Sequence, residues 1–277
     1  LKPVLRSRLW HWAISLPHLK KRRRDRMLDL KDISVTFHAN TVNERKALDH
    51  LSFHVENGDF ISVLGTNGAG KSTLLNVISG SIMSDSGTIL LDGKDITVYP
   101  EYKRAREIGR LFQDPLKGTA PHMTIEENLG LAYSRGKRTT LSRAIKKGDR
   151  SFFIEKLKEL GLGLEDRIST TVGLLSGGQR QALTLLMSTI VTPKLLLLDE
   201  HTAALDPKTA ASVMDITERI VKENHITTLM ITHNMKQALE YGNKTIILNE
   251  GKIVKVLEGE ERKNTTVDDL LNMYDFV

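Results

Sequence analysis

The chain has 277 residues, no cysteine, 27% charged residues and a formal net charge of +6. This length is enough for one large domain or two small ones. The lack of cysteine excludes a disulfide scaffold and thiolate metal sites. No apolar run approaches the roughly 18 residues of a membrane-spanning helix, so we expect any passage through a membrane to be made by another chain.

The positive charge belongs to the first 26 residues. They contain nine Lys or Arg against one acid, Asp25, a net charge of +8 that leaves −2 for residues 27–277. The near-neutral remainder gives no reason to expect nucleic-acid binding. Trp10 and Trp12 beside the basic run allow three interpretations of this extension: a segment that contacts anionic lipid, an Arg-rich targeting leader, or non-native or disordered sequence ahead of a start at Met27.

From Met27 the pattern predicts a mixed α/β layer fold in one domain over 27–277. Apolar positions alternate at 28–37 and 48–55, while 60–64, 88–91, 195–198 and 227–232 are short apolar strand runs. Helical spacing at 124–133, 140–147 and 152–160 predicts an inserted helical subdomain over about 114–175. Pro207 suits the first position of a helix, and residues 249–251 predict a hairpin turn.

A phosphate-binding loop separates the strand at 60–64 from a helix-like run at 74–78. Residues 65–72, GTNGAGKS, fit the pattern GxxxxGK[ST]. Glycines let the backbone wind closely around phosphate, and successive N–H groups form an anion nest at the start of a helix. Lys71 adds a charge for the β- and γ-phosphates, and the Ser72 hydroxyl can hold Mg²⁺. The loop predicts nucleoside triphosphate binding without saying what the nucleotide is for.

Two later stretches narrow the function. Residues 175–179, LSGGQ, predict on their own only a Ser-capped, Gly-rich helix start. About twenty residues on, the apolar strand at 195–198 ends in Asp199 and Glu200. One hard carboxylate for Mg²⁺ and a second as general base are what phosphoryl transfer to water requires, although solvated acids at a strand end are common.

With these motifs in this order, residues 28–256 resemble the nucleotide-binding subunit of an ABC transporter. Gln113 matches the lid glutamine, residues 203–206 the dimer-contact loop, and His233 the switch histidine. The resemblance implies a P-loop NTPase of the ABC ATPase type, with a mixed β-sheet core, an antiparallel β region and an inserted α-helical subdomain. His201 departs from the pattern, because many relatives carry proline there.

The resemblance also implies that two copies sandwich two ATP molecules head to tail and hydrolyse them. Glu200 would polarise the attacking water, and Lys71, Gln113 and His233 would assist it, His233 by contacting the γ-phosphate. Mg²⁺ would be held by Ser72, Gln113 and Asp199. The residues implied to contact ATP are Phe37, Gly65, Thr66, Asn67, Gly68, Ala69, Gly70, Lys71, Ser72, Thr73, Gln113, Ser176, Gly177, Gly178, Gln179, Asp206 and His233. Phe37 is the candidate for stacking on adenine, although a strand aromatic can equally be core.

The implied function is to energise transport of a small solute through a separate integral membrane permease, from the cytoplasmic face of the cell membrane. We expect import rather than export, because no membrane span is fused to the cassette and importers of this family usually keep their subunits separate. Residues 199–207 are similar to ATPases of tryptophan/tyrosine-type bacterial uptake systems, which suggests an amino-acid cargo. A second copy and an extracytoplasmic substrate-binding protein are the other implied partners, with no nucleic acid. We expect residues 117–123 to form part of the groove that receives the permease.

The alternative is a soluble ABC ATPase that acts on ribosomes or nucleic acid. Such proteins usually carry two cassettes or a long coiled-coil insert, whereas this chain has one signature sequence and no long heptad array. A regulatory module that binds ATP without turnover is disfavoured by the presence of Glu200.

Overall fold

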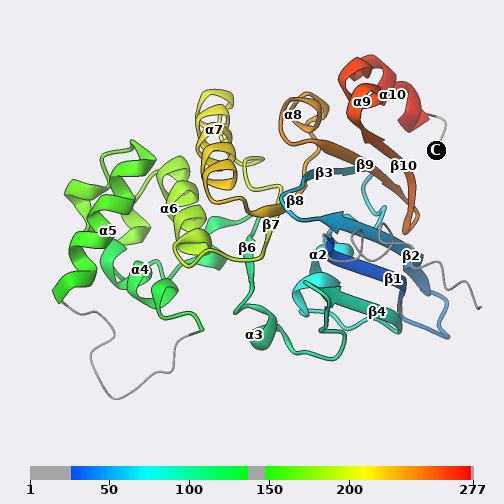
Figure 1. Cartoon of the computed structure of the whole chain (residues 1–277), viewed down its shortest axis with the longest axis horizontal. Helices are drawn as coiled ribbons and strands as arrows, with labels where there is room; N and C mark the ends of the chain where they lie inside the picture. The colour runs from blue at the N-terminus through cyan, green and yellow to red at the C-terminus, as the bar shows by residue number, and fades with distance from the viewer. Residues whose placement is uncertain (1–25, 137–146, 276–277) are drawn as a thin grey trace, which may run out of the picture.

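The computed structural model describes residues 26–136 and 147–275 (Figure 1). The basic extension, apart from Arg26, and all but the last residue of the helix predicted at 140–147 lie outside the described residues. The described chain forms two β-sheets and a group of helices beyond the larger sheet, seen on the left of Figure 1. In the described part of the chain, no helix is long and apolar enough to cross a membrane.

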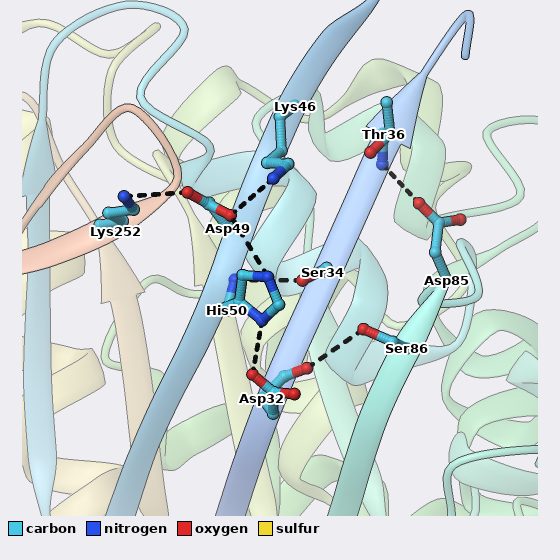
Figure 2. A network of polar contacts seen from close by, with 9 residues as sticks. All are labelled: Asp32, Ser34, Thr36, Lys46, Asp49, His50, Asp85, Ser86 and Lys252. Carbon is cyan, nitrogen blue, oxygen red and sulfur yellow. Dashed lines mark hydrogen bonds and ion pairs between the residues drawn. The ribbon is translucent and has the colours of Figure 1, made fainter. Parts of the chain in front are cut away.

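The smaller sheet is antiparallel, with strand order β2-β1-β4-β5. Its members are β1 (Arg26–Phe37), β2 (Arg45–Glu56), β4 (Ser86–Leu91) and β5 (Lys94–Asp95). Asp32 and His50 have φ angles of 55° and 49°, where the β1–β2 register is irregular. Their side chains meet there, with 2.7 Å between His50 Nδ1 and Asp32 Oδ1 (Figure 2). The antiparallel β region that the family resemblance implied is therefore present in these strand pairs.

The larger sheet has the order β10-β9-β3-β8-β7-β6, in which only β10 is antiparallel to its neighbour. Its members are β3 (Phe60–Gly65), β6 (Ile108–Leu111), β7 (Leu195–Asp199), β8 (Thr227–Ile231), β9 (Lys244–Asn249) and β10 (Lys252–Glu258). Leu195 and Leu197 of β7 face one hydrophobic core, whereas Leu196 and Leu198 face another. Burial on both faces explains why these strands are continuous apolar runs.

Helices cover both faces of the larger sheet. Helix α2 (Lys71–Ser79) packs in the core shared with the smaller sheet. On the other face lie α6 (Gly177–Thr189) and α7 (Pro207–Glu223), while α4 (Ile125–Tyr133) and α5 (Lys147–Leu160) pack against α6 beyond the edge of the sheet (Figure 1). Short elements complete the fold: α3 (Glu101–Arg104), α8 (Met235–Glu240), α9 (Gly259–Asn264), α10 (Val267–Asp275) and the 3₁₀ turns η1 (Pro115–Gly118), η2 (Glu165–Arg167) and η3 (Val172–Leu174).

The turn between β9 and β10 supports the phosphate-binding loop. Gly251 N–H donates to Ala69 O at 2.9 Å, and Asp49 N–H donates to Gly251 O at 3.1 Å. Lys46 and Lys252 each donate to the Asp49 carboxylate at 2.9 Å (Figure 2), and these bonds lower the pKa of Asp49 to about 2. The predicted hairpin therefore exists and connects β2 to the loop.

We expect Gly251→Ala to destabilise the protein more than Gly58→Ala. Both glycines have positive φ, +76° and +81°, so alanine costs either site about 1 to 2 kcal/mol. A Cβ at Gly251 would lie 2.8 Å from both Ala47 O and Leu48 Cα, whereas a Cβ at Gly58 would meet nothing within 4 Å. The forced contact at Gly251 should cost a further amount of about 1 to 3 kcal/mol. Thermal unfolding of the two variants checks this, and equal melting temperatures would contradict it.

Candidate functional site

The loop at 65–72 joins β3 to α2 with the geometry of an anion-binding turn. Gly68 and Gly70 have φ angles of 85° and 104°, which L-residues with a Cβ rarely adopt. Gly70 is the N-cap of α2, and its O accepts the N–H of Leu74 at 2.8 Å. The loop backbone therefore ends at a helix N-terminus, where free N–H groups and the helix dipole favour a bound anion.

Lys71 is buried beneath this loop, with 6% of its surface exposed. Its Nζ donates to Gly65 O at 2.8 Å and to Thr66 O at 3.0 Å. Burial lowers the pKa of Lys71, while the negative charges of Glu200 and Asp199 act in the opposite direction. The loop carbonyls therefore hold a poorly hydrated ammonium at the position where the motif places the phosphate-binding lysine.

A cavity of about 190 Å³ opens beside the loop. Its lining residues are Phe37, Arg45, Ala47, Asn67, Gly68, Gly70, Lys71, Ser72, Thr73, Glu200 and His233. Phe37 and Arg45 are cross-strand partners at the ends of β1 and β2, and Phe37 is 36% exposed. An exposed aromatic ring at the mouth of this cavity fits a role in stacking on a base better than a role in the core.

Arg45 is a lining residue that the sequence did not reveal. Its guanidinium donates to Gly68 O and so adds a second cation next to the loop. Nothing in the polar stretch before β2 marks this arginine, because its place depends on pairing with Phe37 across the hairpin. Only the strand register could have revealed it.

Glu200, the acidic residue directly after β7, has an unusual backbone geometry. Glu200 has a φ of 46°, an uncommon conformation for a residue with a Cβ and one that occurs at functional sites. Its N–H donates to Ile231 O at 3.1 Å, and its Oε1 lies 2.6 Å from His233 Nε2. The structure therefore brings the predicted general base and the predicted switch histidine into direct contact at the cavity wall.

The Asp199 carboxylate lies next to Arg110, whereas the Glu200 carboxylate lies next to His233. Its Oδ2 lies 3.6 Å from Arg110 Nη2 on β6, and both side chains are largely buried. Burial raises the pKa of Asp199, and the Arg110 charge acts in the opposite direction. The Asp199 carboxylate and the Ser72 hydroxyl are both oxygen donors, which is the donor chemistry that Mg²⁺ prefers. The residues present therefore fit a magnesium ion.

Several predicted residues do not line this cavity. Gln113 is exposed just after β6, and Asp206 caps α7 by accepting the Thr209 N–H at 3.1 Å. Ser176 caps α6 in a reciprocal capping box with Gln179. Helices α6 and α2 pack in cores on opposite faces of the larger sheet. The signature residues Ser176, Gly177, Gly178 and Gln179 therefore form a separate surface at the start of α6.

His201, the departure from the family pattern, is a buried side chain. It is 3% exposed, its Nε2 lies 3.4 Å from Thr217 Oγ1 on α7, and burial lowers its pKa to about 4. A neutral imidazole in this position packs the turn after Glu200 against α7. His201 does not line the cavity beside Lys71.

A phosphate loop at the end of a central strand, a carboxylate pair at the end of a neighbouring strand, an antiparallel sheet and a helical group together define an ATP-binding cassette. The family model described as ABC transporter matches residues 48–203. The chain belongs to this family and is an ATP-binding, ATP-hydrolysing subunit of an ABC transporter, as its resemblance to that family predicted.

Individual relatives agree with this assignment. The tyrosine transport ATP-binding protein of Clostridioides difficile (strain R20291) is 45% identical over 251 residues, covering 90% of this chain and 99% of the relative. A spermidine/putrescine import ATP-binding protein of Mesoplasma florum is 30% identical over 241 residues, covering 86% of this chain and 63% of the relative.

Solved structures confirm the fold class. An ATP-binding cassette of an ABC transporter in its ADP conformation superposes with a TM-score of 0.74 at 28% identity, covering 91% of this chain and 98% of that one. A dimeric cassette in a post-hydrolysis state, bound to ADP and phosphate, superposes with a TM-score of 0.72 at 26% identity, covering 84% of this chain and 98% of that one.

Glu200→Gln should abolish hydrolysis and keep nucleotide binding. The amide has almost the same shape and can still contact His233, but it cannot take a proton from water, so we expect the turnover number to fall about 10²- to 10⁴-fold. Glu250→Gln is the matched control, because Glu250 has a similar φ of 45° and an exposed side chain. Phosphate release and ATP binding measure the two effects, and normal turnover in Glu200→Gln would exclude the general-base role.

Proposed function

We propose that this subunit energises the import of an aromatic amino acid through a separate permease, and that tyrosine is the main cargo. The subunit would act at the cytoplasmic face of the membrane. The observation that carries the proposal is the 45% identity to a tyrosine transport ATP-binding protein along 99% of that relative's length. The cassette itself supplies ATP turnover, so the cargo is chosen by the permease and by an extracytoplasmic binding protein.

ATP would be bound between two copies of the chain. The cavity beside Lys71 presents one half of a phosphate site, and the N-terminus of α6 presents another anion-binding end on a separate surface. A head-to-tail dimer places Ser176, Gly177 and Gly178 of one copy over the phosphate loop of the other. The dimeric cassette that this chain resembles supports that arrangement.

Within each half-site the side chains would have distinct tasks. Phe37 stacks on adenine, Lys71 and the loop N–H groups bind phosphates, and Glu200 orients and deprotonates the water while His233 holds Glu200. Ser72, Asp199 and Gln113 would hold Mg²⁺, which would neutralise part of the charge of the phosphates. Ser72 lines the cavity but Asp199 and Gln113 do not, so both of these side chains would have to approach the nucleotide to do so.

A groove next to the helical group is the proposed permease site. It has a volume of about 500 Å³, and its lining includes Glu101, Phe112, Gly118, Leu131 and Met187. Leu131 is 51% exposed at the rim of this cavity, so a large apolar side chain is available there to a partner. Gly118 belongs to the segment 117–123 that we predicted to contribute, so the groove supports that prediction.

Leu131→Asp should disrupt assembly with the permease without disabling the isolated subunit. A buried carboxylate without a partner is costly, so we expect recovery of the permease with the tagged subunit to fall at least about tenfold. Val267→Asp, an exposed apolar residue at the other end of the molecule on α10 (Figure 1), is the control. ATP binding by each purified variant serves as the check on folding. Undiminished recovery with Leu131→Asp would place the permease elsewhere.

Import of tyrosine can be measured directly. Cells that express the chain together with a candidate permease and binding protein should accumulate labelled tyrosine. Lys71→Ala should reduce this uptake to background because the phosphate-binding charge is lost. Unlabelled phenylalanine and tryptophan should compete better than spermidine. Competition by spermidine alone would assign the system to polyamines.

Copurification of ribosomes or nucleic acid with the chain, in place of a permease, would favour the alternative function of a soluble ABC ATPase.

A further inference from the structure

Arg110 connects several parts of the molecule through one side chain, which is 12% exposed. Its Nη2 lies 3.6 Å from Asp199 Oδ2 and donates to Asn76 Oδ1 of α2 at 2.7 Å. Its Nη1 donates to Ser79 Oγ at 3.0 Å, and its guanidinium carbon lies 4.6 Å from the centre of the Phe112 ring. Arg110 therefore contacts the candidate metal ligand Asp199, helix α2 and the Phe112 ring at the same time.

Asp199 is paired with Arg110, while the charges of Glu200 and Lys71 also act on it. Within the described residues, Arg110 is the one ion-pair partner recorded for it, and its carboxylate is only 15% exposed to solvent. Outer partners of metal-binding carboxylates fix which oxygen faces the metal. With Oδ2 facing Arg110, Oδ1 remains as the oxygen available to a cation.

Arg110 also lines the groove of the proposed permease site. Arg110 and Phe112 both line the cavity of about 500 Å³ that receives the permease in the proposed function. Phe112 lies between Arg110 and Gln113 in the chain, directly after β6. An apolar segment packed against the Phe112 ring would therefore also restrain the guanidinium stacked on it.

We propose that Arg110 is a positioning residue that holds Asp199 in the orientation required for Mg²⁺ and makes that orientation sensitive to the groove. The planar fork of arginine can serve Asp199, Asn76 and Ser79 at once, which the compact ammonium of lysine cannot. This inference rests on the proposed magnesium site of Ser72 and Asp199, so its test has to separate the two.

The test measures how Mg²⁺ tightens the binding of a fluorescent, slowly hydrolysed ATP analogue to the purified full chain. In Arg110→Met we expect the Mg²⁺ concentration for half-maximal tightening to rise about tenfold, in the range seen when outer partners of metal ligands are removed. The affinity in EDTA should stay unchanged, because the phosphate loop is intact. Arg110→Lys should recover part of the effect, and Phe112→Ala should show a smaller rise in the same direction.

Arg135→Met is the matched control. Arg135 is also a largely buried arginine of the same groove, and its guanidinium donates to the backbone carbonyls of Ser188, at 3.0 Å, and Val191. It carries the same charge as Arg110 and has no recorded contact with Asp199. We expect Arg135→Met to keep the wild-type Mg²⁺ requirement even if its melting temperature falls as much as that of Arg110→Met.

Asp199→Asn separates the two hypotheses. If it loses the Mg²⁺ effect while Arg110→Met behaves like wild type, the positioning role is wrong and the metal site stands. If Asp199→Asn keeps the wild-type requirement, the proposed metal site itself fails. Equal rises in Arg110→Met and Arg135→Met would attribute the effect to lost charge or packing and overturn the proposal. No change in Phe112→Ala would overturn its link to the groove.

Discussion

The register of the central parallel strands is the constraint on which the site depends. Asp199 at the end of β7 pairs with Ile231 at the end of β8, and Val63 of β3 pairs with the same Ile231. The carboxyl ends of β3, β7 and β8 therefore lie at one edge of the larger sheet, where α/β proteins bind their ligands. A shift of this register would separate Lys71, Glu200 and His233, however well each local motif were formed.

This dependence explains why so much could be predicted from the sequence. Strands buried on both faces are continuous apolar runs, and the functional turns begin where these strands end, at Gly65, Asp199 and Ile231. The Pro207 helix start and the hairpin at 249–251 were likewise local signals and are confirmed. Motif order then identified the family, because a particular sequence of loop, signature and carboxylates is far more specific than any single element.

What the sequence could not show depends on contacts between distant segments. Arg45 reaches the loop through the β1–β2 pairing, and Arg110 reaches Asp199 across the β6–β7 pair, 89 positions along the chain from its partner. Neither arginine stands in a recognisable pattern. β6 was missed because Ile108–Leu111 contains a glycine and an arginine, which weaken the apolar signal of a strand. Gln113 was identified by motif, but its distance from the cavity follows from the backbone path into η1.

The charges around the cavity support a divalent cation in the proposed site. Lys71 and Arg45 lie on the loop side, while Asp199 and Glu200 lie beside them and add two negative charges near the expected phosphates. Carboxylates a few ångströms from a triphosphate repel it, and the repulsion is strong where side chains are buried. The Arg110 charge offsets part of the Asp199 charge, and a divalent cation held by Asp199 would offset the remaining repulsion. The orientation of Asp199 is therefore the point at which nucleotide binding and the state of the groove can influence each other.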